Sequence, residues 1–176
     1  TDGRLATTPH PAIFGSKLKN PYITTDFSES QVELITPNLG TTKETYDFLN
    51  ALYDIVALNI GEEYLWPQSM PCDIPEDEQI PIAEYEDCEV CQKARLYREE
   101  LFKKYGGKKQ LISGIHYNFS FDEEFIKRLH ENFGEGKSYR VFKDEVYLKV
   151  VRNYLEYRWL MIYLIAAAPV IHESYT

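Results

Sequence analysis

The sequence predicts an α+β fold in which strands and helices occupy separate parts of the chain. Residues 23–37 and 109–120 of the 176-residue chain have the β-branched content or the two-residue alternation of strands. Residues 42–60 and 141–167 carry apolar side chains over a broad helical face, at three- and four-residue steps in the first of them. Because strands and helices are segregated rather than alternating, the α+β class is favoured.

The first predicted strand presents carboxylates at short spacing. It covers residues 23–37 and closes at Pro37, because proline has no N–H group to donate to a neighbouring strand. Asp26, Glu29 and Glu33 lie along it, and oxygen ligands of this kind suit a hard cation such as Mg²⁺. A solvated strand face is the alternative interpretation of this segment taken alone.

Two helices are predicted in the middle of the chain, on either side of an irregular segment. Thr41 and Glu44 have capping-box spacing, which predicts a helix from 42 to 60. Residues 66–90 are rich in proline and acidic residues without a clear period, which indicates an irregular segment. A second helix is predicted over 92–105, ended by the glycines at 106 and 107.

The second predicted strand covers residues 109–120 and has two different faces. Its alternation places mostly apolar residues on one face, and Gly114, His116 and Asn118 on the other. Glycine inside a strand often marks the close approach of a ligand, so this face resembles the wall of a site. A half-buried histidine satisfied by hydrogen bonds is the alternative.

The end of the chain is predicted to be helical. Ser120 and Glu123 have capping-box spacing for a short helix to about His130, and a long helix follows over 141–167. The apolar residues 159–171 are too few to span a bilayer, which needs about 20, so they predict a core helix that runs into a loop. We therefore expect no membrane partner.

Composition indicates a folded, acidic protein. Hydrophobic residues make up 44% of the chain and aromatic residues 14%, which is enough for one sizeable core, and the net charge of −9 argues against a nucleic-acid partner. Cys88 and Cys91 have C-x-x-C spacing without a second pair, so free thiols and a cytoplasmic location are expected, with a zinc site or redox pair as the alternative. No secretory signal opens the sequence.

Five short motifs follow one another along the chain. They are Leu5-Ala6-Thr7-Thr8-Pro9-His10-Pro11, residues 22–37, Leu65-Trp66-Pro67-Gln68-Ser69-Met70-Pro71, Leu96-Tyr97-Arg98-Glu99 and residues 112–119. In this order they resemble bacterial-type glutamate–cysteine ligase, including the ligase half of the bifunctional glutathione-synthesising enzymes. The resemblance covers nearly the whole chain. It implies a glutamine-synthetase-like fold: a curved, mainly antiparallel sheet backed by helices, with the site on its concave face.

The resemblance also implies a reaction. ATP, as co-substrate, would phosphorylate the γ-carboxylate of glutamate, and the amine of cysteine would displace phosphate from the acyl phosphate, with Mg²⁺ (or Mn²⁺) as cofactor. This would be the first step of glutathione biosynthesis. Two alternatives stay open: another carboxylate–amine ligase of the same fold, and a binding module without chemistry.

The resemblance assigns roles to particular residues. Glu33 and His116 would be metal ligands, with Asp26 at or beside a metal. Phe27, Tyr97 and Leu101 would form the wall around the incoming cysteine. Arg98 would be the catalytic cation facing the transferred phosphoryl group, a position that suits a planar guanidinium. Asn118 would contact substrate or the metal shell. Glu29 would be a structural carboxylate, or would contact a metal ligand rather than the metal itself.

The chain also departs from the family pattern. The family carries a Gly-Leu-Glu-Arg-Glu-type motif, with two metal-ligating glutamates, upstream of the Leu5 motif, and further site residues beyond the last position of this chain. Residues 1–176 are therefore expected to be a single incomplete segment of a catalytic domain that needs the remainder of the same polypeptide. Alone, the segment is expected to be inactive and to self-associate or lose order.

Overall fold

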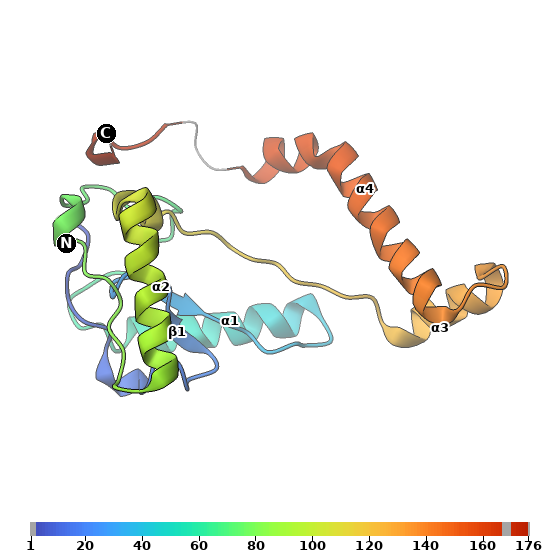
Figure 1. The fold of residues 1–176 in the computed structure, drawn as a ribbon, viewed down its shortest axis with the longest axis horizontal. Helices are drawn as coiled ribbons and strands as arrows, with labels where there is room; N and C mark the ends of the chain where they lie inside the picture. Colours follow the sequence, from blue (N-terminus) through green and yellow to red (C-terminus); the bar gives the residue numbers. More distant parts are fainter. Residues whose placement is uncertain (1–2, 167–169, 176) are drawn as a thin grey trace. The chain divides into compact units, whose positions relative to one another are not determined.

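A computed structural model describes residues 3–166 and 170–175 of the chain (Figure 1). In order, its elements are a 3₁₀ turn at Ala12–Phe14, strands β1 (Ile23–Thr25) and β2 (Val32–Leu34), helix α1 (Thr42–Ala57), a 3₁₀ turn at Asp77–Gln79, helix α2 (Glu89–Tyr105), a 3₁₀ turn at Lys108–Leu111, helices α3 (Glu123–Phe133) and α4 (Tyr139–Ile165), and a 3₁₀ turn at Glu173–Tyr175. The described residues are mostly helical, with a small antiparallel sheet. They form two compact units, residues 3–114 with 170–175, and residues 115–166.

The prediction of one strand over residues 23–37 was wrong, because the chain turns back on itself there. β1 and β2 pair antiparallel, with Thr24 opposite Glu33. Between them, the Thr25 hydroxyl donates to the carbonyl oxygens of Ser28 (2.6 Å) and Gln31 (3.0 Å). Threonine and serine side chains that bond to nearby backbone in this way compete with a continuous strand. The run is therefore a hairpin with a side-chain-bonded turn.

The hairpin packs on α1 in the first core of the larger unit. Ile23 of β1 is buried together with Leu52 and Val56 of α1. α1 begins after Thr41, whose hydroxyl oxygen accepts the Glu44 N–H at 3.2 Å, which confirms the predicted N-cap. The helix ends at Ala57, three residues before the predicted end.

A second core in the same unit forms where α2 and the irregular segment meet. Phe27, Ile74, Ile80 and Leu111 are buried there, and Leu101 of α2 packs against them. α2 confirms the helix predicted over 92–105, although it begins earlier, at Glu89.

Gly106 ends α2, within the glycine pair predicted to do so, and Gly107 leads into the next 3₁₀ turn. Gly106 has a φ of +80°, in the left-handed region that favours glycine. A Cβ on Gly107 would lie 3.0 Å from the side chains of Ile80 and Phe102, so a larger residue would require these neighbours of the second core to shift by a few tenths of an ångström.

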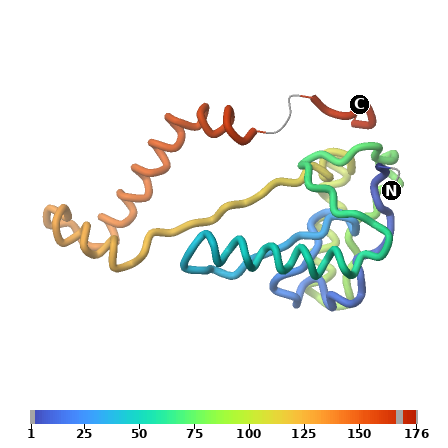
Figure 2. The backbone as a smooth tube through the Cα atoms, turned by 180° about the vertical axis from the view of Figure 1, so that it is seen from behind, coloured from blue at the N-terminus to red at the C-terminus, as the bar shows by residue number. Residues whose placement is uncertain are grey.

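The strand predicted over residues 109–120 is not formed. Lys108–Leu111 is a 3₁₀ turn, and the tube in Figure 2 shows no helical turn over residues 112–122, which have no regular structure. A strand needs a neighbour to accept its N–H groups, and none of the strands in the described part of the chain pairs with this run. Its apolar alternation instead lies in solvent, with Ile115 96% exposed.

Helices α3 and α4 make up the smaller unit. The capping box predicted at Ser120 is wrong: the N-cap is Asp122, whose side chain accepts the Phe125 N–H at 3.0 Å. Buried Ile126 of α3 and Phe142 of α4 are the core residues here, and Tyr139 donates its hydroxyl to Glu123 at 2.6 Å.

The apolar end of α4 is not the core helix that the sequence predicts. Trp159 is 62% exposed and Tyr163 is 82% exposed, because no other element of this unit covers them. Ala167, at the predicted end of the helix, and Pro169 lie outside the described residues. Among the helices of residues 3–166 and 170–175, none is long and apolar enough to cross a membrane.

Candidate functional site

The candidate site is built on the β1–β2 hairpin. Glu33 lies opposite Thr24, and both face away from Ile23 and Thr25, which are buried. Asp26 follows β1 directly, is exposed, and donates its N–H to the Gln31 carbonyl at 3.0 Å. The hairpin therefore presents Asp26 and Glu33 to solvent, two of the three carboxylates that the sequence singles out.

Arg98 joins α2 to this turn across 72 positions of sequence. Its Nε donates to the Asp26 carbonyl oxygen, and its Nη2 donates to that of Thr25 at 3.3 Å. Nη1 donates to Ala94 at 3.1 Å, one turn back on the same helix. The structure thus brings together Arg98 and Asp26, two residues predicted for the site. The contact joins the side chain of Arg98 to the backbone of Asp26.

Tyr85 supports the guanidinium from the side. The Arg98 Cζ lies 5.0 Å from the centre of the Tyr85 ring, a cation–π distance. Burial raises the pKa of the Tyr85 hydroxyl, an effect that Arg98 partly opposes. Sequence analysis does not find Tyr85, because nothing in a lone tyrosine of an acidic loop indicates that it lies against a cation 13 residues later.

The three residues predicted for the cysteine wall lie in two environments. Tyr97 and Leu101 line an open hollow of about 310 Å³ on α2, together with Glu100 and Lys104. Phe27 is only 2% exposed and belongs to the second core, against which Leu101 also packs. Leu101 therefore links the core to the hollow, and the Phe27 ring lies within the core.

His116 and Asn118 lie in the other unit. Both are exposed, in the segment without regular structure that precedes α3. A metal site shared by Glu33 and His116 stays a prediction. Within residues 3–166 and 170–175, no three His, Cys, Asp or Glu side chains converge in a way that could hold a metal ion.

Glu29 holds three stretches of chain together, which is the structural one of its two expected roles. Its buried carboxylate accepts the His10 N–H at 2.6 Å, the Glu84 N–H at 2.6 Å and the Lys17 ammonium. Burial opposes ionisation, but these hydrogen bonds outweigh it and hold the pKa of Glu29 below its usual value.

A cavity of about 510 Å³ lies beside this carboxylate. His10 lines it and is 7% exposed, with no hydrogen-bond partner for either ring nitrogen among the described residues. Burial, and then the nearby Lys17, lower the pKa of His10, so its ring is neutral at physiological pH. The sequence placed His10 in a motif, between Pro9 and Pro11, but it did not predict that the histidine is buried and neutral.

The comparisons with known proteins agree with one another. The family model described as glutamate-cysteine ligase matches residues 1–176. The bifunctional glutathione biosynthesis protein GshAB of Clostridium perfringens is 54% identical over 175 residues, which is 98% of this chain and 22% of that protein.

Two solved structures are also similar. The bifunctional glutathione synthetase of Pasteurella multocida matches with a TM-score of 0.86 and 42% identity, over 98% of this chain and 22% of that one. The glutamate–cysteine ligase of Francisella tularensis in complex with AMP matches with a TM-score of 0.83 and 34% identity, over 99% and 34%. The chain thus spans between about a fifth and a third of these proteins.

Proposed function

The chain belongs to the glutamate-cysteine ligase family, and we propose that the full protein containing it joins glutamate to cysteine using ATP. The family match over residues 1–176 carries this proposal. The names of the relatives support it: one is a glutathione biosynthesis protein, and one ligase is solved with AMP. We propose further that the hairpin is part of a larger curved antiparallel sheet of the glutamine-synthetase type.

The proposed reaction has two displacements. An oxygen of the glutamate γ-carboxylate attacks the terminal phosphorus of ATP, which gives an acyl phosphate and releases ADP. The cysteine nitrogen then attacks the acyl carbon, the bond to phosphate breaks, and the amine loses a proton. Positioning and charge neutralisation dominate the first step, so no covalent enzyme nucleophile is needed.

Arg98 is the residue that we propose faces the transferred phosphoryl group. A guanidinium has five N–H groups, and the carbonyls of Asp26, Thr25 and Ala94 take three of them. One N–H on each terminal nitrogen has no acceptor among the described residues, and this pair suits two phosphoryl oxygens. The three carbonyls and the Tyr85 ring would hold the fork in place.

The hollow on α2 is the proposed wall for the cysteine substrate. Tyr97 and Leu101 offer an aromatic and an aliphatic surface to a small thiol-bearing side chain, and Phe27 would support Leu101 from the core. Lys103 and Lys104 add positive charge at its rim. Asn118 is also proposed to contact substrate.

The metal ion that the family implies would need ligands in addition to Asp26 and Glu33. Mg²⁺ in phosphoryl-transfer sites takes one or two carboxylates together with phosphate oxygens. Asp26 and Glu33 fit that description, with His116 as a further proposed ligand, but three such groups do not converge among the described residues.

The test uses the full-length protein. With glutamate, cysteine and MgATP, ADP release should require both amino acids, and mass spectrometry should find the γ-linked dipeptide. Turnover that is faster with another amine than with cysteine would indicate that the protein is a different carboxylate–amine ligase of this fold. Nucleotide binding without any ADP release would indicate a binding module.

A further inference from the structure

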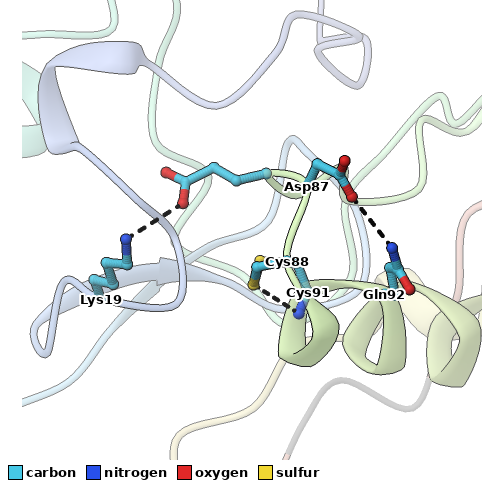
Figure 3. The surroundings of a disulfide bond; sticks show 6 residues. Lys19, Asp87, Cys88, Cys91 and Gln92 are labelled. Atoms are coloured by element: carbon cyan, nitrogen blue, oxygen red, sulfur yellow. Dashed lines mark hydrogen bonds and ion pairs between the residues drawn. A yellow bond between two sulfur atoms is a disulfide. The ribbon is translucent and has the colours of Figure 1, made fainter.

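Cys88 and Cys91 form a disulfide, so the prediction of free thiols at these positions was wrong (Figure 3). The physical reason is local. Cys88 is the N-cap of α2 and Cys91 lies three residues on, so the first helical turn brings the two sulfurs together, and the Cys88 Sγ accepts the Cys91 N–H at 3.1 Å. Cys72 is the free cysteine of the described chain.

The two cysteines differ in exposure. Cys88 is exposed, whereas Cys91 is only 3% exposed and faces the protein interior. A thiolate can therefore approach the disulfide from the Cys88 side, with Cys91 in the position of the leaving group. At a helix N-terminus the dipole and the free N–H groups stabilise a thiolate, and here they would stabilise that of Cys88, whose Sγ accepts the Cys91 N–H.

The disulfide adds little to the stability of the folded protein. The loop that it closes contains two residues between the cysteines, and the stabilisation from a cross-link grows with the length of the loop. The residues it joins already belong to one hydrogen-bonded helical turn. We propose that Cys88–Cys91 is a thiol–disulfide exchange site for low-molecular-weight thiols, at which Cys88 is the attacked sulfur.

The exchange balances with two thiols. The first, as a thiolate, attacks the Cys88 Sγ, the bond to Cys91 breaks, and Cys91 leaves as a thiolate that takes up the proton. The second thiolate attacks the sulfur of the bound thiol and releases it as a disulfide, and Cys88 takes up the second proton. Two thiols are oxidised to one small disulfide, and the protein gains two thiols.

The charge around the pair sets which thiols react fastest. Four carboxylates stand within six residues of sequence, and two lysines pair with two of them: Lys19 with Glu86 at 3.8 Å and Lys93 with Glu89 at 2.7 Å. Glu84 and Asp87 complete the set, so the segment around the disulfide carries four carboxylates, of which two are paired with lysines. Anionic thiolates are repelled by the field of these carboxylates, and salt screens the effect.

The position of the pair connects it to the candidate site. α2 begins at the disulfide and carries Tyr97, Arg98 and Leu101. If the proposed function holds, the cysteine substrate is itself a thiol of the reacting class, so the site would sense the same compound that the enzyme uses.

The first test compares three thiols on the full-length protein without ATP or glutamate, so that it does not depend on ligase activity. Cysteamine, cysteine and 3-mercaptopropionate give thiolates that are net neutral, singly negative and doubly negative. Opening of the disulfide is followed by acid quench, maleimide labelling and mass spectrometry. Each rate is divided by the rate of the same thiol with hydroxyethyl disulfide, which removes intrinsic reactivity.

We expect the corrected rates to fall in that order, by about tenfold overall at low salt, and to converge in high salt. A pair that stays closed with every thiol overturns the proposal. So does a protein whose Cys88 and Cys91 are both reduced when it is purified without reductant.

The second test uses matched single-cysteine variants in a Cys72→Ser background. With cystine, Cys91→Ser should form a mixed disulfide at Cys88, and Cys88→Ser should label at Cys91 about tenfold more slowly because that sulfur is buried. Equal rates would show that accessibility does not select Cys88. The wild-type kinetics decide the matter if either variant fails to fold.

Discussion

Replacing Glu29 by glutamine should loosen the loops around it while leaving the smaller unit unchanged. One carboxylate oxygen accepts from Lys17 and the Glu84 N–H, and the other accepts from the His10 N–H. A glutamine amide has one oxygen and one NH₂ group, so in either orientation at least one buried donor faces another donor. Lys17 also loses its counter-charge, although its side chain is only 15% exposed.

The magnitude follows from those lost contacts. An unsatisfied buried donor costs about 1–3 kcal/mol, and the loss of a charged partner places this site in the upper part of that range, at about 2–3 kcal/mol. Local opening of residues 8–30 should then be about 30- to 140-fold more frequent, since about 1.4 kcal/mol is a factor of ten. Hydrogen exchange followed by mass spectrometry measures this directly, and peptides from α3 and α4 serve as the internal control.

The effect should depend on pH with a definite sign. Because the folded-state pKa of Glu29 lies below the usual 4.5, its ionised form stabilises the folded protein above that pH. This contribution is lost as the pH falls through the folded pKa, so the difference between the wild type and Glu29→Gln should shrink there. An unchanged exchange rate at neutral pH, or a difference that persists in acid, would refute the reasoning.

Three further outcomes are expected. If the proposed function holds, Arg98→Ala in the full-length protein should lower kcat by about 10²–10³ with a much smaller rise in the KM for glutamate. Arg98→Lys should recover only part of the rate, since a point charge lacks the bidentate fork. Steady-state kinetics at saturating MgATP distinguishes this result from an effect on KM alone. The 176-residue chain alone should show no turnover in a coupled ADP assay, and rates comparable to the full-length enzyme would show that the remaining sequence is not needed for the chemistry. Asp122→Ala should destabilise α3 by about 1 kcal/mol in urea unfolding, whereas Ser120→Ala, at the wrongly predicted cap, should change nothing measurable.

The helices were predictable because their signals are local. Thr41 caps α1 as its spacing with Glu44 indicates, and Gly106 ends α2 where a left-handed residue is needed. The error at Ser120 has a similar local cause, because Asp122 is an equally good cap two residues later and lies nearer the helix.

The strands were less predictable because pairing is not local. The hydroxyl of Thr25 donates to the backbone within the turn. A two-residue alternation of side chains in the sequence does not reveal such a hydrogen bond. Residues 112–122 have the alternation of a strand without a neighbour.

Only part of the candidate site follows from sequence pattern. The meeting of Arg98 with the backbone of Asp26 spans 72 positions, and only the family resemblance placed both in one site. The roles of His10 and Tyr85 could not be predicted from the sequence. Both have buried polar atoms without a hydrogen-bond partner among the described residues, which is a property of the packed molecule. The C-x-x-C spacing allowed a disulfide at Cys88, but spacing does not determine oxidation state.

The three hydrogen bonds to the Glu29 carboxylate determine which substitutions this region can tolerate. Two of the three donors are backbone N–H groups, at positions 10 and 84, and substitutions there leave those donors in place unless proline is introduced. Only the Lys17 ammonium is supplied by a side chain. Position 29 must therefore supply an anion whatever residues stand opposite it, whereas position 17 can vary if another cation compensates. Epistasis at this junction should be one-sided: changes at 17 become tolerable through second substitutions, and changes at 29 do not.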